Sequence, residues 1–167
     1  NKFFPDINYI FIVRDPRDII SSMIKVGQEQ EKNKIKNQYC RNINDLCDHI
    51  NESYQLILIN KFKNLFEKKV YIVKYENFVY NFSYELKNIC KKFSLKTKYS
   101  DNINVWSKAS EIYKDKIKNN TGYFSDLWNK PITNKKIGNY RNILTQDEIE
   151  IINNKCNHLL KKFKYID

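Results

Sequence analysis

The clearest pattern in the chain lies at residues 9–27, where an apolar run gives way to helical spacing. Residues 9–13 are all apolar, and three of them are β-branched. Such a run is typical of a strand buried on both faces, as in parallel sheets. After Arg14-Asp15-Pro16, apolar residues recur at helical spacing: Ile19, Ile20, Met23 and Ile24. The pattern predicts a strand, a tight turn and a helix.

The turn between these two elements has clear local signals. Pro16 suits the first position of a helix, where its missing N–H costs nothing. Asp15 stands at the N-cap position, and Asp18 adds a negative charge to the first turn. Arg14 is therefore expected at the carboxyl end of the strand, which is the edge where open α/β sheets bind ligands.

Further periodic segments follow in an order that predicts an α/β fold. Helical spacing predicts a long amphipathic helix over residues 43–66 and another over residues 83–93. Between them, residues 70–73 predict a second buried strand, so that strand, helix and strand form a βαβ crossover. Thr145 and Glu148 have the spacing of a capping box, which predicts a last helix reaching about Phe163.

The remaining segments are less regular. Residues 28–38 are almost wholly polar and predict a surface loop or an exposed helix. Apolar residues are scattered over residues 96–136, where a short helix is expected around residues 106–118. The aromatic residues of this stretch argue against disorder. No repeat or second domain is visible, so residues 1–167 are expected to form a single domain.

Composition and charge narrow the class of protein. With 167 residues and 41% hydrophobic residues, the chain is long and apolar enough for a globular core. The net charge of +11 suggests a polyanionic partner, such as nucleic acid, a phosphorylated nucleotide or an acidic membrane. A lysine-rich solvated surface accounts for the charge equally well.

The cysteines and histidines point to no metal site. None of the four cysteines lies at metal-ligand spacing from another cysteine or from a histidine. Three cysteines fall on apolar helical faces, which indicates buried free thiols and favours a reducing compartment. His49 and His158 are expected to be structural or surface residues. No apolar run reaches about 18 residues, so no membrane span is predicted.

Arg14 and Ser22 could together hold a phosphate. A guanidinium supplies charge and a planar fork, a hydroxyl supplies a neutral donor, and the helix start adds positive potential. The alternatives are an ion pair of Arg14 with Asp15 or Asp18, and simple helix packing for Ser22.

Two other groups carry candidate chemistry. Tyr75 stands at the end of the second strand, where it could stack on a nucleobase or belong to the core. Lys135, Lys136 and Arg141 surround Gly138, which permits close backbone approach. This segment could be a basic loop that closes on a phosphate, or a pair of solvated lysines. No glycine-rich Walker-type phosphate loop is present in the sequence.

Four stretches resemble segments of the sulfotransferase family. Residues 10–22 closely resemble its 3′-phosphate-binding segment: a hydrophobic strand, then Arg-Asp-Pro-Arg-Asp, with a serine eight residues after the first arginine. Residues 70–77 resemble the next strand, which ends in Tyr-Glu-Asp in the family, and residues 83–95 resemble the helix after it. Residues 136–145 resemble the C-terminal Gly-x-Trp-Arg segment, with Tyr140 in place of the tryptophan.

The resemblance implies a fold, a donor and a set of binding residues. The fold would be a P-loop-like, three-layer α/β fold with a parallel sheet, of which this chain is the C-terminal part. The donor would be 3′-phosphoadenosine 5′-phosphosulfate (PAPS). Arg14 and Ser22 would bind its 3′-phosphate, and Tyr75 would contact the adenine. The other binding residues would lie on a loop that closes over the nucleotide: Lys135, Lys136, Gly138 and Arg141.

The resemblance also implies a reaction. A sulfuryl group would pass to a hydroxyl or amine on a small molecule, carbohydrate or protein, without a metal or nucleic acid. The catalytic base and the phosphosulfate-binding loop would precede residue 1, so residues 1–167 are expected to be truncated at the N-terminus and active only in the complete enzyme. Cytoplasmic location is expected, or the Golgi lumen if an N-terminal anchor precedes the chain.

Two other functions remain open on the sequence. One is a non-catalytic, basic α/β module that binds nucleotides or nucleic acid. The other is a fragment of a P-loop kinase-like enzyme, for which a GxxxxGK[ST] run would have to lie upstream. The sequence indicates neither the acceptor nor the oligomeric state.

Overall fold

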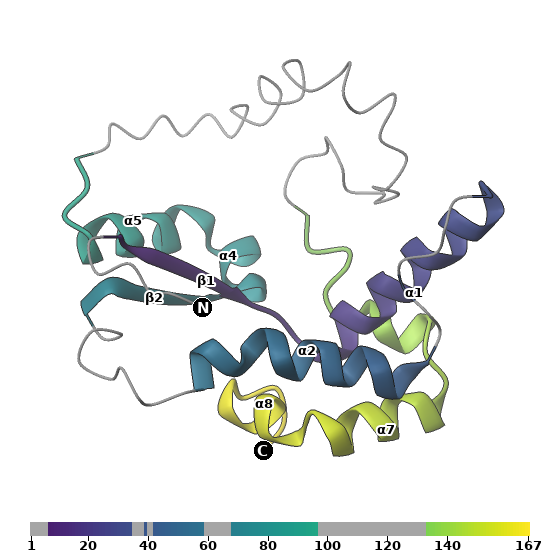
Figure 1. The fold of residues 1–167 in the computed structure, drawn as a ribbon. Coiled ribbons are helices and arrows are strands. Elements are labelled where there is room, and N and C mark those ends of the chain that lie inside the picture. Colours follow the sequence, from purple (N-terminus) through teal and green to yellow (C-terminus); the bar gives the residue numbers. More distant parts are fainter. Residues whose placement is uncertain (1–6, 35–38, 40–41, 59–67, 97–132) are drawn as a thin grey trace.

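The computed structural model describes residues 7–34, 39, 42–58, 68–96 and 133–167. Strands β1 (Tyr9–Val13) and β2 (Val70–Lys74) lie side by side in parallel (Figure 1). Tyr9 pairs with Val70, and Val13 pairs with Lys74. The predicted α/β class and the parallel βαβ crossover are therefore confirmed.

Helix α1 (Pro16–Lys32) begins directly after the turn that follows β1. As predicted, Asp15 is its N-cap and accepts a hydrogen bond from the Arg17 N–H at 2.9 Å. The helix runs into the polar stretch and includes Gln30, whose side chain has no exposed surface. That part of the stretch is thus helical and partly buried.

Helix α2 (Ile43–Leu58) confirms the first part of the long helix predicted between the strands. The predicted continuation through residues 59–66 lies outside the described residues. After β2, helix α4 (Tyr75–Tyr80) starts without an intervening loop, and α5 (Phe82–Lys92) follows. In Figure 1, α4 and α5 lie on one side of the sheet and α2 on the other. The prediction of a helix at residues 83–93 is confirmed to within one residue at each end.

The capping box predicted at Thr145 is present. Its Oγ1 accepts a hydrogen bond from the Glu148 N–H at 3.2 Å, and Glu148 Oε2 accepts one from the Thr145 N–H at 2.8 Å. These bonds start helix α7 (Gln146–Lys155), which a single 3₁₀ turn, η2 (Asn139–Asn142), precedes in the chain.

The last helix is not continuous, which corrects the prediction of one helix reaching Phe163. It breaks at Cys156, and α8 (Asn157–Lys162) follows. Figure 1 shows α8 turned away from the direction of α7. The apolar face stays packed across the break, because Leu159 and Leu160 of α8 are both completely buried.

The core lies among α1, α2, the C-terminal helices and the face of the sheet that is turned away from α4 and α5 (Figure 1). Its most deeply buried members are Val13, Ile20, Cys47, Ile152, Cys156 and Leu159. Cys47, Cys90 and Cys156 are buried thiols outside any disulfide, as predicted, whereas Cys40 lies outside the described residues. Both histidines are exposed.

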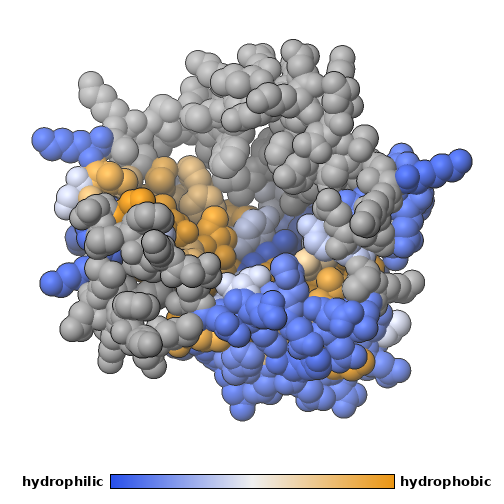
Figure 2. Space-filling view, in the orientation of Figure 1, coloured by the Kyte–Doolittle hydropathy of each residue, from blue (hydrophilic) through white to orange (hydrophobic). Residues whose placement is uncertain are grey.

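The prediction that β1 is buried on both faces is wrong for this structure. Ile10 is 48% exposed and Ile12 is 59% exposed. On that side of the sheet, α4 and α5 pack against β2, and Tyr71 of β2 bonds to Glu85 of α5. Figure 2 shows hydrophobic residues gathered over the region of the sheet and hydrophilic ones over the lower helices.

The irregular stretch expected at residues 96–136 falls largely outside the described residues, including the short helix expected around 106–118. Within the described ranges, no helix is long and apolar enough to cross a membrane.

Candidate functional site

Parallel pairing brings the carboxyl ends of β1 and β2 together, and each strand is followed by a candidate binding residue. Arg14 follows β1, and Tyr75 follows β2 as the first residue of α4. The Arg14 guanidinium carbon lies 4.7 Å from the centre of the Tyr75 ring. This is a cation–π contact, which attracts the charge to the ring without neutralising it.

The backbone of Arg14 is fixed by a tyrosine on α2. The Arg14 N–H donates to the Tyr54 hydroxyl at 2.9 Å, and that hydroxyl donates to the Arg14 carbonyl at 3.2 Å. Burial raises the pKa of Tyr54, so the hydroxyl stays protonated and can serve in both roles. The helix that connects the two strands thereby positions the end of β1.

The side chain of Arg14 has mainly neutral partners. Its Nη2 donates to the Lys136 carbonyl at 2.8 Å, and the nearest carboxylate contact, to Asp18 Oδ2, is 3.9 Å long. Its Nε is buried, and the part of the chain that the structure describes offers no acceptor to it. Arg14 therefore combines a weakly compensated charge with an unused N–H.

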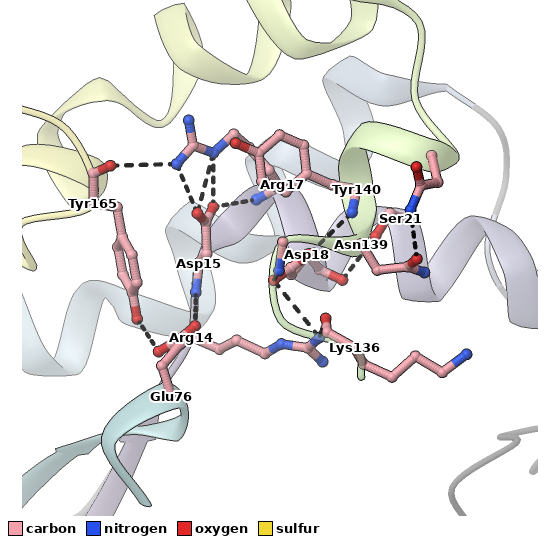
Figure 3. Close-up of polar contacts among 12 residues, drawn as sticks. Arg14, Asp15, Arg17, Asp18, Ser21, Glu76, Lys136, Asn139, Tyr140 and Tyr165 are labelled. Carbon is pink, nitrogen blue, oxygen red and sulfur yellow. Dashed lines mark hydrogen bonds and ion pairs between the residues drawn. The ribbon is translucent and has the colours of Figure 1, made fainter. Parts of the chain in front are cut away.

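Arg17 differs from Arg14 because a carboxylate compensates it fully. Its Nη2 lies 2.7 Å from Asp15 Oδ2, and its Nε donates to both oxygens of that carboxylate. Burial alone would lower the pKa of Arg17, but the hydrogen bonds and negative charge of Asp15 outweigh burial and raise it. Of the ion pairs considered from the sequence, the one between Arg14 and Asp15 is thus not formed, since Asp15 pairs with Arg17 (Figure 3).

Asp18 ties the segment before α7 to the start of α1. Its Oδ2 accepts from the Gly138 N–H at 2.7 Å, and its Oδ1 accepts from the Tyr140 N–H at 3.1 Å. Burial raises the pKa of this carboxyl group, although the two N–H groups and Arg14 act in the opposite direction. Gly138 has φ +73°, a conformation that favours glycine. The turn at residues 138–140 is therefore held against the helix that follows Arg14.

The structure brings some of the predicted binding residues together at the end of β1 and leaves others exposed on the surface. Four surround the end of β1 through side-chain or backbone contacts: Arg14, Tyr75, Lys136 and Gly138. Three are exposed: Ser22, Lys135 and Arg141. Among the described residues, the Arg14 side chain contacts Lys136, Asp18 and Tyr75 rather than these three. The Arg141 guanidinium instead stacks on the Tyr140 ring, with 4.6 Å from its carbon to the ring centre.

Besides Tyr54, two residues at this site were not identified from the sequence. Glu76 lies one residue after Tyr75, and its Oε1 accepts from the Asp15 N–H at 3.2 Å. Its Oε2 accepts from the Tyr165 hydroxyl at 2.8 Å. The sequence could have indicated Glu76, since it lies just after the carboxyl end of a predicted strand. Tyr165 had none, because it belongs to neither a periodic segment nor a motif.

The described residues contain no group of three or more histidine, cysteine, aspartate or glutamate side chains that could hold a metal ion. The ends of the strands instead carry the carboxylates of Asp15, Asp18 and Glu76, each bonded to a backbone N–H, together with the half-buried Arg14 guanidinium and the Tyr75 ring. The guanidinium and the ring suit an anion that carries an aromatic ring.

Comparison with known families assigns the chain to a family. Residues 1–101 of the 167 match the model of the Sulfotransferase family, which covers both strands and helices α1, α2, α4 and α5. The chain belongs to the sulfotransferase family. The turn at residues 138–140 and the C-terminal helices lie outside the matched range. No curated protein and no solved structure matches the chain.

Proposed function

We propose that this chain supplies the 3′-phosphate and adenine side of a donor site for PAPS in a sulfotransferase with a P-loop-like, three-layer fold. Membership of the family supports a role in sulfuryl transfer. The observation that carries the choice of donor is the state of Arg14. Its guanidinium is half-buried against Tyr75, and among the described residues it has no short carboxylate contact and no acceptor for its Nε–H.

The surroundings of Arg14 suit a phosphate. A phosphate oxygen could accept from Nε once the Arg14 side chain shifts to uncover it, which would give this N–H a charged partner. The N-terminus of α1 follows directly and adds positive potential. Ser22 lies on the exposed surface of α1 one turn beyond Asp18, so its hydroxyl would donate to the same phosphate from the outer side.

The aromatic and basic neighbours of Arg14 suit the remainder of the nucleotide. The half-buried Tyr75 ring would stack on the adenine, with Arg14 holding its position. Lys135 and Arg141 are exposed on either side of the Gly138 turn and would approach the phosphates when the nucleotide binds. The Lys136 carbonyl orients Arg14 rather than the ligand.

In this proposal the residues of the chain bind the donor and do not perform the chemistry. Sulfuryl transfer to a hydroxyl or amine needs a general base and cationic stabilisation of the departing phosphate. Cytoplasmic location and a small-molecule, carbohydrate or protein acceptor belong to the same proposal.

Calorimetric titration with adenosine 3′,5′-bisphosphate and adenosine 5′-phosphate tests the site. We expect the bisphosphate to bind at least about tenfold more tightly, because a charge-assisted contact to the 3′-phosphate is worth about 1.5 kcal/mol or more. Arg14→Gln should abolish this preference. Lys87→Gln removes the same charge from an exposed position on α5 and should preserve it.

Two results would contradict the proposal. One is equal affinity of the wild-type chain for the two nucleotides. The other is a preference that Arg14→Gln leaves unchanged or that Lys87→Gln lowers equally, since either would show a response to net charge rather than to the Arg14 site.

A further inference from the structure

The segment that follows α8 returns to the ends of both strands. The Tyr165 hydroxyl donates to Glu76 Oε2 at 2.8 Å, just after β2 (Figure 3). The Tyr165 carbonyl accepts from Arg17 Nη2 at 3.4 Å, at the start of α1. Lys74, the last residue of β2, donates from Nζ to the Lys164 carbonyl at 3.3 Å. The C-terminal segment thus contacts elements on both sides of the Arg14 site.

Glu76 links Tyr165 to the peptide unit that carries Arg14. One carboxylate oxygen accepts from the Tyr165 hydroxyl, and the other accepts from the Asp15 N–H at 3.2 Å. The Asp15 nitrogen is bonded directly to the carbonyl carbon of Arg14. The direction of this peptide sets where the Arg14 side chain leaves the backbone.

The surroundings of Tyr165 keep its hydroxyl protonated, so that it can donate a hydrogen bond to Glu76. Burial, the negative charge of Glu76 and the hydrogen bond to it raise the pKa of Tyr165, so its hydroxyl remains protonated. The Lys74 ammonium lies 4.2 Å from the centre of the Tyr165 ring and holds the ring from another side. A hydrogen bond to a carboxylate is stronger than one between neutral groups, so it restricts the rotation of Glu76.

We infer that Tyr165, acting through Glu76, is a positioning residue for the Arg14 guanidinium. The inference rests on the proposed function and extends it to a residue outside the family match. Tyr54 and Glu76 hold the two sides of the Arg14–Asp15 peptide, and Tyr165 holds Glu76. Without the Tyr165 hydroxyl, the guanidinium should lose its fixed direction while Tyr75 and the core stay in place.

Tyr165→Phe tests this inference with two measurements, because it removes the hydroxyl and keeps the ring. Amide hydrogen exchange at Asp15 should become roughly fivefold faster, while exchange at Ile152 in α7 stays unchanged. The preference for adenosine 3′,5′-bisphosphate over adenosine 5′-phosphate should fall by roughly fivefold. Tyr80→Phe makes the same chemical change at a 61% exposed position on α4 and should alter neither value.

Variants of Glu76 separate positioning from general stability. In Glu76→Gln the amide oxygen can still accept from Asp15 and the amide nitrogen can donate to the Tyr165 oxygen, so most of the nucleotide preference should remain. Glu76→Ala removes both bonds and should lose as much preference as Tyr165→Phe, or more.

The outcomes distinguish this inference from the proposed function. Unchanged exchange at Asp15 in Tyr165→Phe, or equal weakening of both nucleotides, overturns the positioning role. Faster exchange at Asp15 in a chain whose wild type does not prefer the bisphosphate supports the link through Glu76 and overturns the donor site instead.

Discussion

Arg14 and Arg17 show how position decides the use of two identical side chains. Both guanidinium groups lie against tyrosine rings. Arg17 also has a bidentate carboxylate partner in Asp15, whereas the contact between Arg14 and Asp18 is 3.9 Å long. A fully paired arginine contributes to the stability of the turn, and a weakly paired one remains available for an anion.

Asp18→Asn is predicted to destabilise the folded chain by about 2 kcal/mol, because a buried N–H would lose its acceptor. The asparagine oxygen can replace one carboxylate oxygen, but its NH₂ group would face the N–H of Gly138 or Tyr140. Urea denaturation measures this change in the free energy of unfolding.

Asp48→Asn is the control for this prediction. Asp48 is 60% exposed in its side chain and pairs with Lys155 at 3.1 Å, so its loss should cost less than about 1 kcal/mol. Equal destabilisation by the two variants would show that the bonds from Asp18 to the turn contribute no more than a surface ion pair.

At the scale of elements, periodicity was sufficient to predict most of the fold. Apolar spacing predicted both strands, the crossover helix and α5, because each element buries one continuous face. It could not predict the exposure of Ile10 and Ile12, since burial depends on which elements pack against a strand. Nor could it predict the break at Cys156, where the apolar spacing continues without interruption through Leu159 and Leu160.

The packing of α5 against β2 has a titratable contact. The Tyr71 hydroxyl donates to Glu85 Oε2 at 2.8 Å, and burial, together with the bond and charge of Glu85, raises the pKa of Tyr71 to about 12. The pKa is higher in the folded than in the unfolded chain, so this contribution to stability is complete below about pH 10. It should be lost as the pH rises from about 10 through about 12.

Tyr71→Phe should reduce this pH dependence of the free energy of unfolding. Denaturation of the wild type and the variant at a series of pH values between about 8 and 12 measures it. Tyr80→Phe, at an exposed position on α4, should retain the wild-type slope. A wild-type slope in Tyr71→Phe would assign the alkaline loss of stability to other groups.

At the scale of the whole chain, the site depends on contacts that are distant in sequence. The motif that begins at Arg14 was predictable because all its residues lie within one strand, turn and helix. The partners that hold it are Tyr54, Glu76, Lys136 and Tyr165. Local patterns cannot reveal such partners, because each bond depends on how separate elements pack. Tyr54 was identified only as an apolar position of its helix, although its hydroxyl carries two bonds to Arg14.

We propose that the Arg14 Nε–H, which has no acceptor among the described residues, receives the 3′-phosphate of a nucleotide. Nuclear magnetic resonance of the arginine Nε–H groups during titration with adenosine 3′,5′-bisphosphate tests it most directly, with Arg14→Lys to assign the signal. The Arg14 signal should move on binding, while the Arg17 signal, already bonded to Asp15, should stay in place. A titration that moves other signals and leaves that of Arg14 unchanged would contradict the claim.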